Sequence, residues 1–322
     1  MKLRNWVALA SATTGAIGLG LIAKSFLPQH FATDEGYSLP EEVFSEHTHD
    51  QRDFSALPAV DVLFLRCGSQ TIPEWAAVRG GSFSPLVISH SAVLVRHPRA
   101  TFLYDTGLCT DIYTYLTGQS ILLRKTLMNF VFEQSLSSHL ERLGLKSSDL
   151  DFALLSHLHW DHVGGIPDIP GVPLHINRVE YEAATLGLLD AWDGLVRRLM
   201  GDNPLEFFDC AGPPFEGFRS SYDLFGDGSV VLVPLPGHTA GNTGMFINRS
   251  NGSRLFLLGD AVWVSENYAR PATMHPLIWL RVTQDDATAR QTLIQLHHYA
   301  LQHPEIPLIA IHDAEMQKQF RS

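Results

Sequence analysis

Three histidines and one aspartate stand within seven consecutive residues of this chain, in the stretch SHLHWDH at 156–162. The stretch follows the apolar run DFALL, which is typical of a buried strand, and precedes a Gly-Gly pair that permits a tight turn. Alternate side chains of an extended segment share a face, so His157 and His159 can reach one metal ion. If the chain then turns into a helix, Asp161 and His162 project beside them toward a second ion. Imidazole and carboxylate donors without thiolate favour zinc, with iron, manganese or cobalt as alternatives.

Further residues of metal-ligand type follow apolar runs elsewhere in the chain. His238 follows VVLVPLP in a glycine-rich turn, Asp260 ends RLFLLGD, and the final run PLIAIHD contains His312. Each signal is weak alone, because turns commonly contain aspartate and glycine. A single loop cannot close two metal sites, however, and these three strand ends supply the donors that the heptapeptide lacks.

The elements that must position these residues alternate between strands and helices. We expect strands in the stretches 60–68, 91–97, 100–107, 151–156, 173–178, 229–236, 244–250, 254–260 and 307–313. The stretch 68–85 is expected to be a loop, 110–146 has helical spacing, and 287–304 is an amphipathic helix. A turn at Asn251 and Gly252 would join two of the strands into a hairpin.

The chain divides by composition into three parts. Residues 1–24 contain Lys2 and Arg4 followed by an uncharged segment at 5–23, the layout of an export signal or a membrane anchor. A buried N-terminal helix of a cytosolic protein is the alternative. We expect residues 25–58 to be a polar linker and 59–322 to be the folded domain that carries the ligand-type residues and any catalytic function. The export interpretation predicts a periplasmic or extracytoplasmic enzyme with possible membrane association.

The charge and cysteine content exclude some classes of partner. The chain has 23 basic and 34 acidic residues and a net charge of −11, which disfavours nucleic acid. A small molecule is the expected partner. The cysteines Cys67, Cys109 and Cys210 are odd in number and widely separated, so no disulfide framework or thiolate zinc cluster is indicated.

These landmarks, in this order, resemble the metallo-β-lactamase fold superfamily from about Ala59 to the end of the chain. The motifs that carry the resemblance are LYDTG (103–107), SHLHWDHVGG (156–165), PGHTAGNTG (236–244), LLGD (257–260) and IHD (311–313). The resemblance implies an α+β fold, an αββα sandwich of two mixed sheets flanked by helices, with two divalent metal ions at one edge.

The resemblance also implies a role for each ligand-type residue. The first ion would be held by His157, His159 and His238. The second ion would be held by Asp161, His162 and His312. Asp260 would bridge the two ions, and Asp105 would orient the ligand loop without touching metal.

The implied chemistry is hydrolysis. Two cations would lower the pKa of a shared water from about 15.7 to about 7, which makes hydroxide available at neutral pH. We expect it to attack the carbonyl of a small carboxylic ester, lactone or thioester, with Asp161 as proton shuttle and Asp260 as the second catalytic carboxylate. The alternatives are an iron-dependent redox enzyme on the same fold, a β-lactam hydrolase, and a non-enzymatic metal-binding protein, whose sign would be a missing ligand.

Within the superfamily the motifs are most similar to the quorum-quenching lactonase branch. That branch often has a tyrosine three residues after the bridging aspartate, where this chain has Trp263. Indole lacks the phenol oxygen and cannot protonate a leaving alkoxide in the same manner. Trp263 would line the pocket or belong to the core.

Other aromatic residues are candidates for pocket walls, which would favour an apolar acyl or aromatic substrate. They are Trp75, Phe83, Tyr113 or Tyr115, and Trp279. The eleven histidines outside the ligand pattern are not expected to act at the site.

Overall fold

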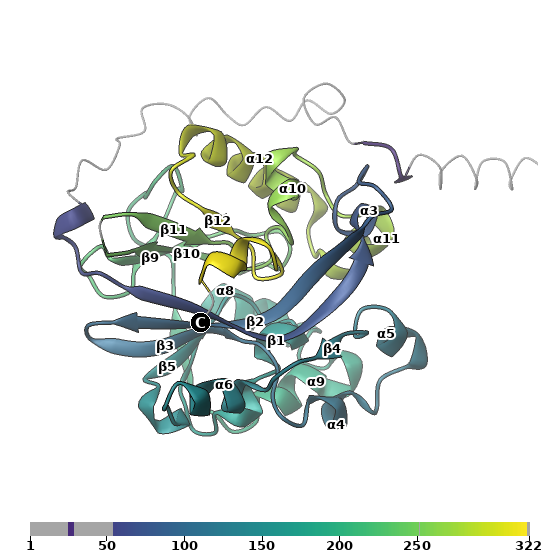
Figure 1. Cartoon of the computed structure of the whole chain (residues 1–322), viewed down its shortest axis with the longest axis horizontal. Coiled ribbons are helices and arrows are strands. Elements are labelled where there is room, and N and C mark those ends of the chain that lie inside the picture. Colours follow the sequence, from purple (N-terminus) through teal and green to yellow (C-terminus); the bar gives the residue numbers. More distant parts are fainter. Residues whose placement is uncertain (1–24, 29–53, 251, 321–322) are drawn as a thin grey trace, which may run out of the picture.

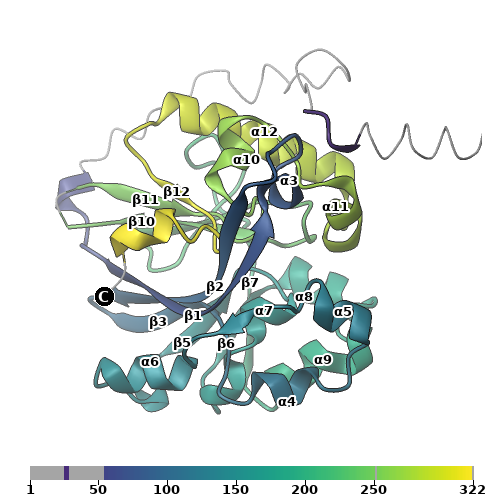
Figure 2. The same ribbon diagram turned by 45° about the vertical axis from the view of Figure 1, so that its right-hand side comes forward.

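Two β-sheets pack face to face between two layers of helices in the computed structural model, which describes residues 25–28, 54–250 and 252–320 (Figures 1 and 2). The seven-stranded sheet has the order β4-β1-β2-β3-β5-β6-β7, and the five-stranded sheet has the order β12-β11-β10-β9-β8. Both sheets mix parallel and antiparallel pairs, such as β3 with β5 and β2 with β3 in the first sheet. The predicted αββα sandwich is confirmed.

The element bounds are as follows. The first sheet contains β1 (Asp61–Pro73), β2 (Pro85–His97), β3 (Ala100–Thr106), β4 (Val131–Phe132), β5 (Phe152–Leu155), β6 (Leu174–Asn177) and β7 (Leu205–Phe208). The second contains β8 (Tyr222–Asp223), β9 (Val230–Pro234), β10 (Thr243–Asn248), β11 (Arg254–Leu257) and β12 (Leu308–Ile309). The α-helices are α3 (Glu74–Ala77), α4 (Ile112–Leu116), α5 (Ile121–Lys125), α6 (Leu136–Arg142), α7 (Trp160–Val163), α8 (Arg178–Thr185), α9 (Ala191–Met200), α10 (Ser265–Ala269), α11 (Pro276–Val282) and α12 (Asp286–Gln302).

The strands of both sheets are apolar on both faces, because one face packs against the other sheet and the opposite face packs against helices. On β10, Met245 and Ile247 belong to the core between the two sheets, whereas Phe246 belongs to the core under α12. This alternation follows from the two-residue period of a strand. The helix α12 completes the outer layer with Leu293 and Leu296, which are buried one helical turn apart.

The structure corrects two of the expected elements. The first third of the expected loop at 68–85 is strand, because β1 runs on to Pro73, and β2 already begins at Pro85. The two strands pair from Asp61 opposite Arg96 to Pro73 opposite Pro85, with α3 in the connection. The helical stretch at 110–146 is divided into α4, α5 and α6, and β4 interrupts it. The expected hairpin is confirmed, since β10 pairs with β11 up to Asn248 opposite Arg254.

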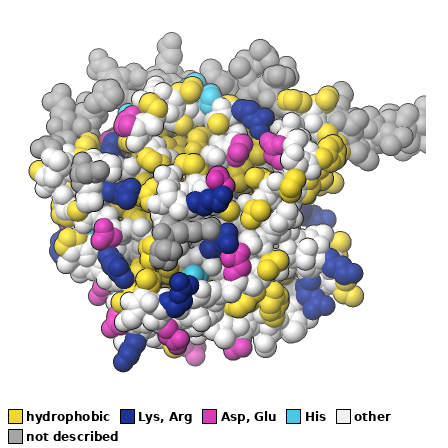
Figure 3. All heavy atoms as spheres, in the orientation of Figure 1, with side chains coloured by type: hydrophobic (Ala, Val, Ile, Leu, Met, Phe, Trp, Pro, Cys, Tyr) yellow, Lys and Arg dark blue, Asp and Glu magenta, His cyan; other side chains and the backbone are white. Residues whose placement is uncertain are grey.

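The predicted export or anchor segment, residues 1–24, lies outside the described residues, as does most of the linker. From the linker, Phe26 packs against Trp75 and His275 with ring centroids 5.0 and 4.8 Å apart. Among the described helices, none combines the length and apolar character needed to cross a bilayer. On the face shown in Figure 3, basic and acidic side chains are interspersed.

Candidate metal centre

All the predicted ligand residues lie at one edge of the sandwich, in loops that follow strand ends. Residues 157–162 follow β5 of the first sheet, and His159 is the N-cap residue of the short helix α7. The other three come from the second sheet: His238 follows β9, Asp260 follows β11 and His312 follows β12. The site is therefore assembled by the contact between the two sheets.

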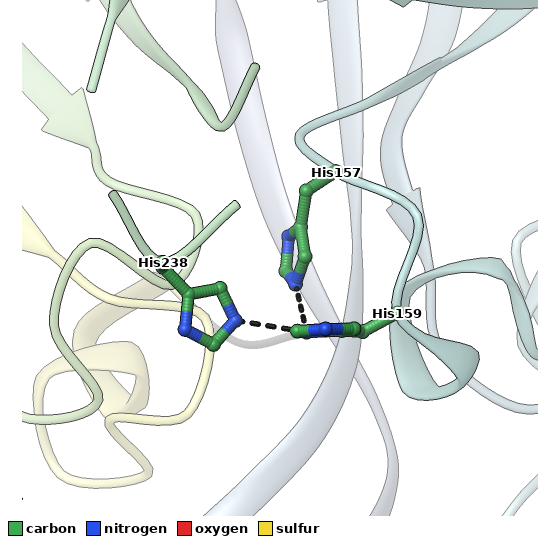
Figure 4. A group of neighbouring side chains, drawn as sticks. All are labelled: His157, His159 and His238. Atoms are coloured by element: carbon green, nitrogen blue, oxygen red, sulfur yellow. Dashed lines mark hydrogen bonds between the residues drawn. The ribbon is translucent and has the colours of Figure 1, made fainter. Parts of the chain in front are cut away.

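The first donor group consists of His157, His159 and His238, whose rings converge from two loops (Figure 4). Nδ1 of His159 lies 3.0 Å from Nε2 of His157 and 2.9 Å from Nε2 of His238. Ligands bound tetrahedrally to zinc through nitrogen stand about 3.3 Å apart. The spacing of these nitrogens therefore fits a cation with little rearrangement.

The second donor group consists of Asp161, His162 and His312, and Asp260 lies between the two groups. Oδ1 of Asp260 is 3.3 Å from Nε2 of His162, and its Oδ2 is 3.1 Å from Nε2 of His312 and 3.5 Å from Nε2 of His238. Oδ2 of Asp161 is 3.5 Å from Nε2 of His312. One close triplet of donors is the predicted first group, but the second predicted group is divided: His162 and Asp260 lie with His157, whereas Asp161 and His312 lie with His90.

The protonation of these side chains suits metal binding. Burial lowers the pKa of His159 to about 4 and that of His238 to about 3, and it lowers the pKa of His157 well below its usual range. The first donor group is thus neutral at pH 7, with ring lone pairs free to bind a cation. Burial opposes ionisation of Asp260, but the neighbouring His312 and His162 outweigh it and hold the pKa of this carboxyl well below its usual range.

Two polar atoms at the centre of the site have no hydrogen-bond partner in the described part of the chain. They are Nε2 of His162 and Oδ1 of Asp260, both buried. Buried polar atoms are nearly always satisfied by protein, water or an ion. Their mutual distance of 3.3 Å and their chemistry fit a shared divalent cation.

Asp105 contacts both ends of the ligand loop at 156–162. Its carboxylate accepts hydrogen bonds from the backbone nitrogen and hydroxyl of Ser156, both at 2.7 Å, and Oδ2 lies 2.8 Å from Nδ1 of His162. Its backbone is left-handed, with φ of 56°. Aspartate tolerates this conformation better than most residues. Asp105 thus holds the ring of His162 through Nδ1, while the other ring nitrogen, Nε2, faces Asp260.

Two other buried polar residues that sequence reasoning missed connect the ligand loops. Glu180 accepts a hydrogen bond from the backbone nitrogen of Leu158 at Oε1 and from that of Gly241 at Oε2, each at 2.9 Å. Asn242 accepts from the backbone nitrogen of Asp260 and donates to backbone oxygens on either side. The only sequence signal for Glu180 is its place at the start of α8, which does not distinguish it from a solvated charge.

A cavity of about 370 Å³ opens onto the candidate metal centre. Of the predicted wall residues, Trp75 and Trp263 line it, whereas Phe83 and Tyr113 do not. Phe83 is mostly exposed, and Tyr113 stacks on Phe130 with ring centroids 5.3 Å apart. Tyr115 and Trp279 also lie outside the lining. The residues that sequence reasoning missed include Trp160, Trp192, Met128 and Ile278.

His90 is a further missed residue. It belongs to the histidines that are not expected to act at the site, yet it is buried in the cavity wall, and its Nδ1 lies 3.3 Å from Oδ2 of Asp161. No local signal singles it out, because it stands between Ser89 and Ser91, just before the expected strand at 91–97.

The chain is similar in sequence to a known family of proteins. A family model described as the metallo-beta-lactamase superfamily matches residues 86–295. A protein named probable metallo-hydrolase from Mycobacterium bovis is 27% identical over 281 residues, which cover 82% of this chain and 84% of that protein. N-acyl homoserine lactonase AttM of Rhizobium radiobacter is 26% identical over 193 residues, 59% of this chain and 68% of the relative.

Solved structures share the fold at lower identity. A quorum-quenching N-acyl homoserine lactone lactonase superposes with a TM-score of 0.62 at 19% identity, covering 82% of this chain and 96% of that one. AidC, a dizinc quorum-quenching lactonase in complex with a product, superposes with a TM-score of 0.55 at 15% identity, covering 80% and 89% of the two chains.

Proposed function

The chain belongs to the metallo-β-lactamase superfamily and is a metal-dependent hydrolase, and from this premise we propose that it opens lactones with an apolar acyl group at a centre of two divalent cations. Zinc is the metal that the donor set favours. The observation that carries the proposal is the position of Asp260. Its two oxygens lie within 3.5 Å of ring nitrogens from both donor groups, where a bridging ligand is required.

Each donor group would hold one cation, and Asp260 would be shared. A pair of divalent cations supplies an activated water at neutral pH and polarises a carbonyl oxygen. Asp161 lines the cavity beside them. Burial opposes its ionisation, but His90, His162 and His312 hold the pKa of this carboxyl well below its usual range. Asp161 therefore enters the reaction ionised, able to accept a proton at a carboxylate oxygen and return it to the leaving alkoxide.

The cavity supports the choice of an apolar acyl group. Its wall is mainly hydrophobic and includes Trp75, Trp263, Leu277 and Ile278. Its volume of about 370 Å³ is in the range of small-molecule sites. Lys125 and Arg281 are the cationic side chains among its lining residues, so a phosphodiester would find few partners. The preference for lactones over other esters rests on the relatives named lactonases.

The test is a substrate panel with the full chain loaded with zinc. The panel contains N-acyl homoserine lactones of increasing chain length, an aryl ester, a thioester and a β-lactam. We expect proton release from the lactones, with kcat/KM rising with the length of the acyl chain. Hydrolysis confined to the other classes, or undiminished activity after exhaustive chelation, contradicts the proposal. An iron-dependent visible spectrum of the purified protein would instead favour redox chemistry.

The assignment of the site is tested in the same assay by substitution. We expect His159→Ala and Asp260→Ala to abolish hydrolysis and to retain the circular dichroism of the wild type. His175→Gln is a control, because His175 lies on β6 and pairs with Glu206 outside the site. Full activity in either site variant would refute the assignment.

A further inference from the structure

His90 is fixed in the wall of the cavity by its strand. On β2, Ser89 and Ser91 both donate side-chain hydrogen bonds to Gln317, so the alternate residue His90 faces the other way. Ile88 and His90 accordingly both line the cavity. His90 is 2% exposed, and its ring packs near those of Phe130 and Trp160 with centroids 5.5 and 5.7 Å away.

The backbone also holds His90 beside His312. The nitrogen of Ser89 donates to the backbone oxygen of His312 at 3.0 Å, and Nδ1 of His312 donates to the backbone oxygen of Ser89 at 2.7 Å. The second contact leaves Nε2 of His312 directed into the site, which is the usual arrangement for a ligating histidine. The rings of His90 and His312 stand 5.4 Å apart.

The polar atoms of His90 lack ordinary partners. Neither ring nitrogen has a well-formed hydrogen bond in the described residues, although both are buried. Oδ2 of Asp161 lies 3.3 Å from Nδ1 of His90. An imidazole buried in this manner is unfavourable unless something else satisfies it.

The distances point to a cation as the missing partner. Oδ2 of Asp161 lies 3.3 Å from Nδ1 of His90 and 3.5 Å from Nε2 of His312, and the donor atoms of all three residues lie within 4.8 Å of one another. Two atoms that each bind one zinc ion at about 2.1 Å can lie at most about 4.2 Å apart, and both separations involving Asp161 are below that limit.

We propose that His90 is a direct ligand of the second cation, in addition to the residues that the superfamily motifs supply. The inference rests on the proposed dinuclear centre. It adds a neutral donor from the first sheet to a position otherwise held by Asp161, His162, His312 and the shared Asp260. The second cation is then retained more tightly than its motif residues alone would achieve.

The test compares His90→Ala and His90→Gln with a matched control, His97→Gln. His97 is a second buried histidine on β2, and its Nε2 lies 3.3 Å from Oδ2 of Asp227, far along the strand from the site. Metal content and the affinity for each zinc equivalent are measured by competition with a chromogenic chelator. We expect both His90 variants to lose at least about tenfold in affinity for the second equivalent, while the control retains both ions.

The glutamine variant separates a ligand from a mere hydrogen-bond donor to Asp161. Its amide can donate to the carboxylate but replaces imidazole poorly as a ligand. Wild-type affinity in His90→Gln, or in both variants, overturns the proposal. Thermal unfolding of the metal-free variants identifies any that fail to fold.

A second test uses only the wild-type protein and therefore does not depend on whether a variant folds. In protein loaded with cobalt(II), the ring protons of His90 should shift strongly when the second equivalent binds, in spectra of histidine-labelled protein. An unshifted His90 ring overturns the proposal. If the wild type binds only one ion or hydrolyses no lactone, the proposed function is wrong, and the result does not count against His90 in particular.

Discussion

The indole nitrogen of Trp263 donates a hydrogen bond of 3.2 Å to Oδ2 of Asp260. The side chain lines the cavity and also packs in a core cluster with Ile88 and Trp279, so it is part of the pocket wall and of the core at once. Because its N–H is directed at this carboxylate, Trp263 orients the residue that we propose as the bridging ligand. In the proposed mechanism, proton transfer to the leaving group is the task of Asp161.

Replacing Trp263 with phenylalanine should lower metal affinity or kcat by about tenfold or more, because partners of ligating groups contribute on that scale. Phenylalanine keeps an aromatic ring in the wall and removes only the donor. The effect is measured by zinc competition and by lactone hydrolysis. An unchanged variant would show that the hydrogen bond to Asp260 does not matter for the centre.

Replacing Glu180 with glutamine should weaken the first donor group. The carboxylate joins the loop of His157 and His159 to the loop of His238, and an amide can accept only one of its two backbone hydrogen bonds. We expect about 1–3 kcal/mol less stability to unfolding by urea, together with weaker binding of the first ion. Glu182→Gln on the exposed face of α8 is the control. Equal effects of the two substitutions would contradict the role of Glu180.

Replacing Asp105 should separate its backbone role from its side-chain role. Asparagine tolerates the left-handed backbone but cannot accept all the hydrogen bonds from Ser156 and His162. Asp105→Asn should therefore lose affinity for the second ion with little change in the melting temperature. Asp105→Ala should lose affinity for the second ion and also have a lower melting temperature, since alanine adds strain in a left-handed backbone. The idea fails if asparagine preserves second-ion affinity.

Acidification should release the two ions in order. Protons compete for the first donor group only near pH 4 and below, because burial lowers the pKa of His159 to about 4 and that of His238 to about 3. Burial also opposes protonation of His162 and His312, but Asp260 outweighs it and raises both pKa values above their usual range. Protons therefore compete for the second donor group already at neutral pH.

The zinc-to-protein ratio after equilibration at a series of pH values checks this order. We expect a first decrease already as the pH falls through neutrality and a second below about pH 4. The loss of both ions in one step, or earlier loss from the first donor group, would contradict the assignment of these pKa shifts to separate sites.

The fold class and the positions of the motif residues could be predicted from the sequence because their signals are local. The donors of SHLHWDH are adjacent, and His238, Asp260 and His312 each follow an apolar run. Glu180 and His90 could not be predicted in this way. What distinguishes them is burial against loops that are distant in sequence, such as the loop of Gly241 for Glu180.

The aromatic wall was harder to predict for the same reason. Tyr113 lies on α4 and stacks on Phe130, and Phe83 lies near the tip of the β1–β2 hairpin, so neither reaches the lining. Residues 68–73 continue the pairing of β1 past the bulge between Arg66 and Gly68, and in the connection that follows Trp75 lines the cavity whereas Phe83 is exposed.

The division of donors between the two sheets has a consequence for how the enzyme matures. A chain emerging from the ribosome presents residues 157–162 long before His238, Asp260 and His312, so no partial product can enclose both ions. Binding of the second ion would require that the two sheets have already packed together. Each proposed ion would then cross-link the two sheets until it is removed.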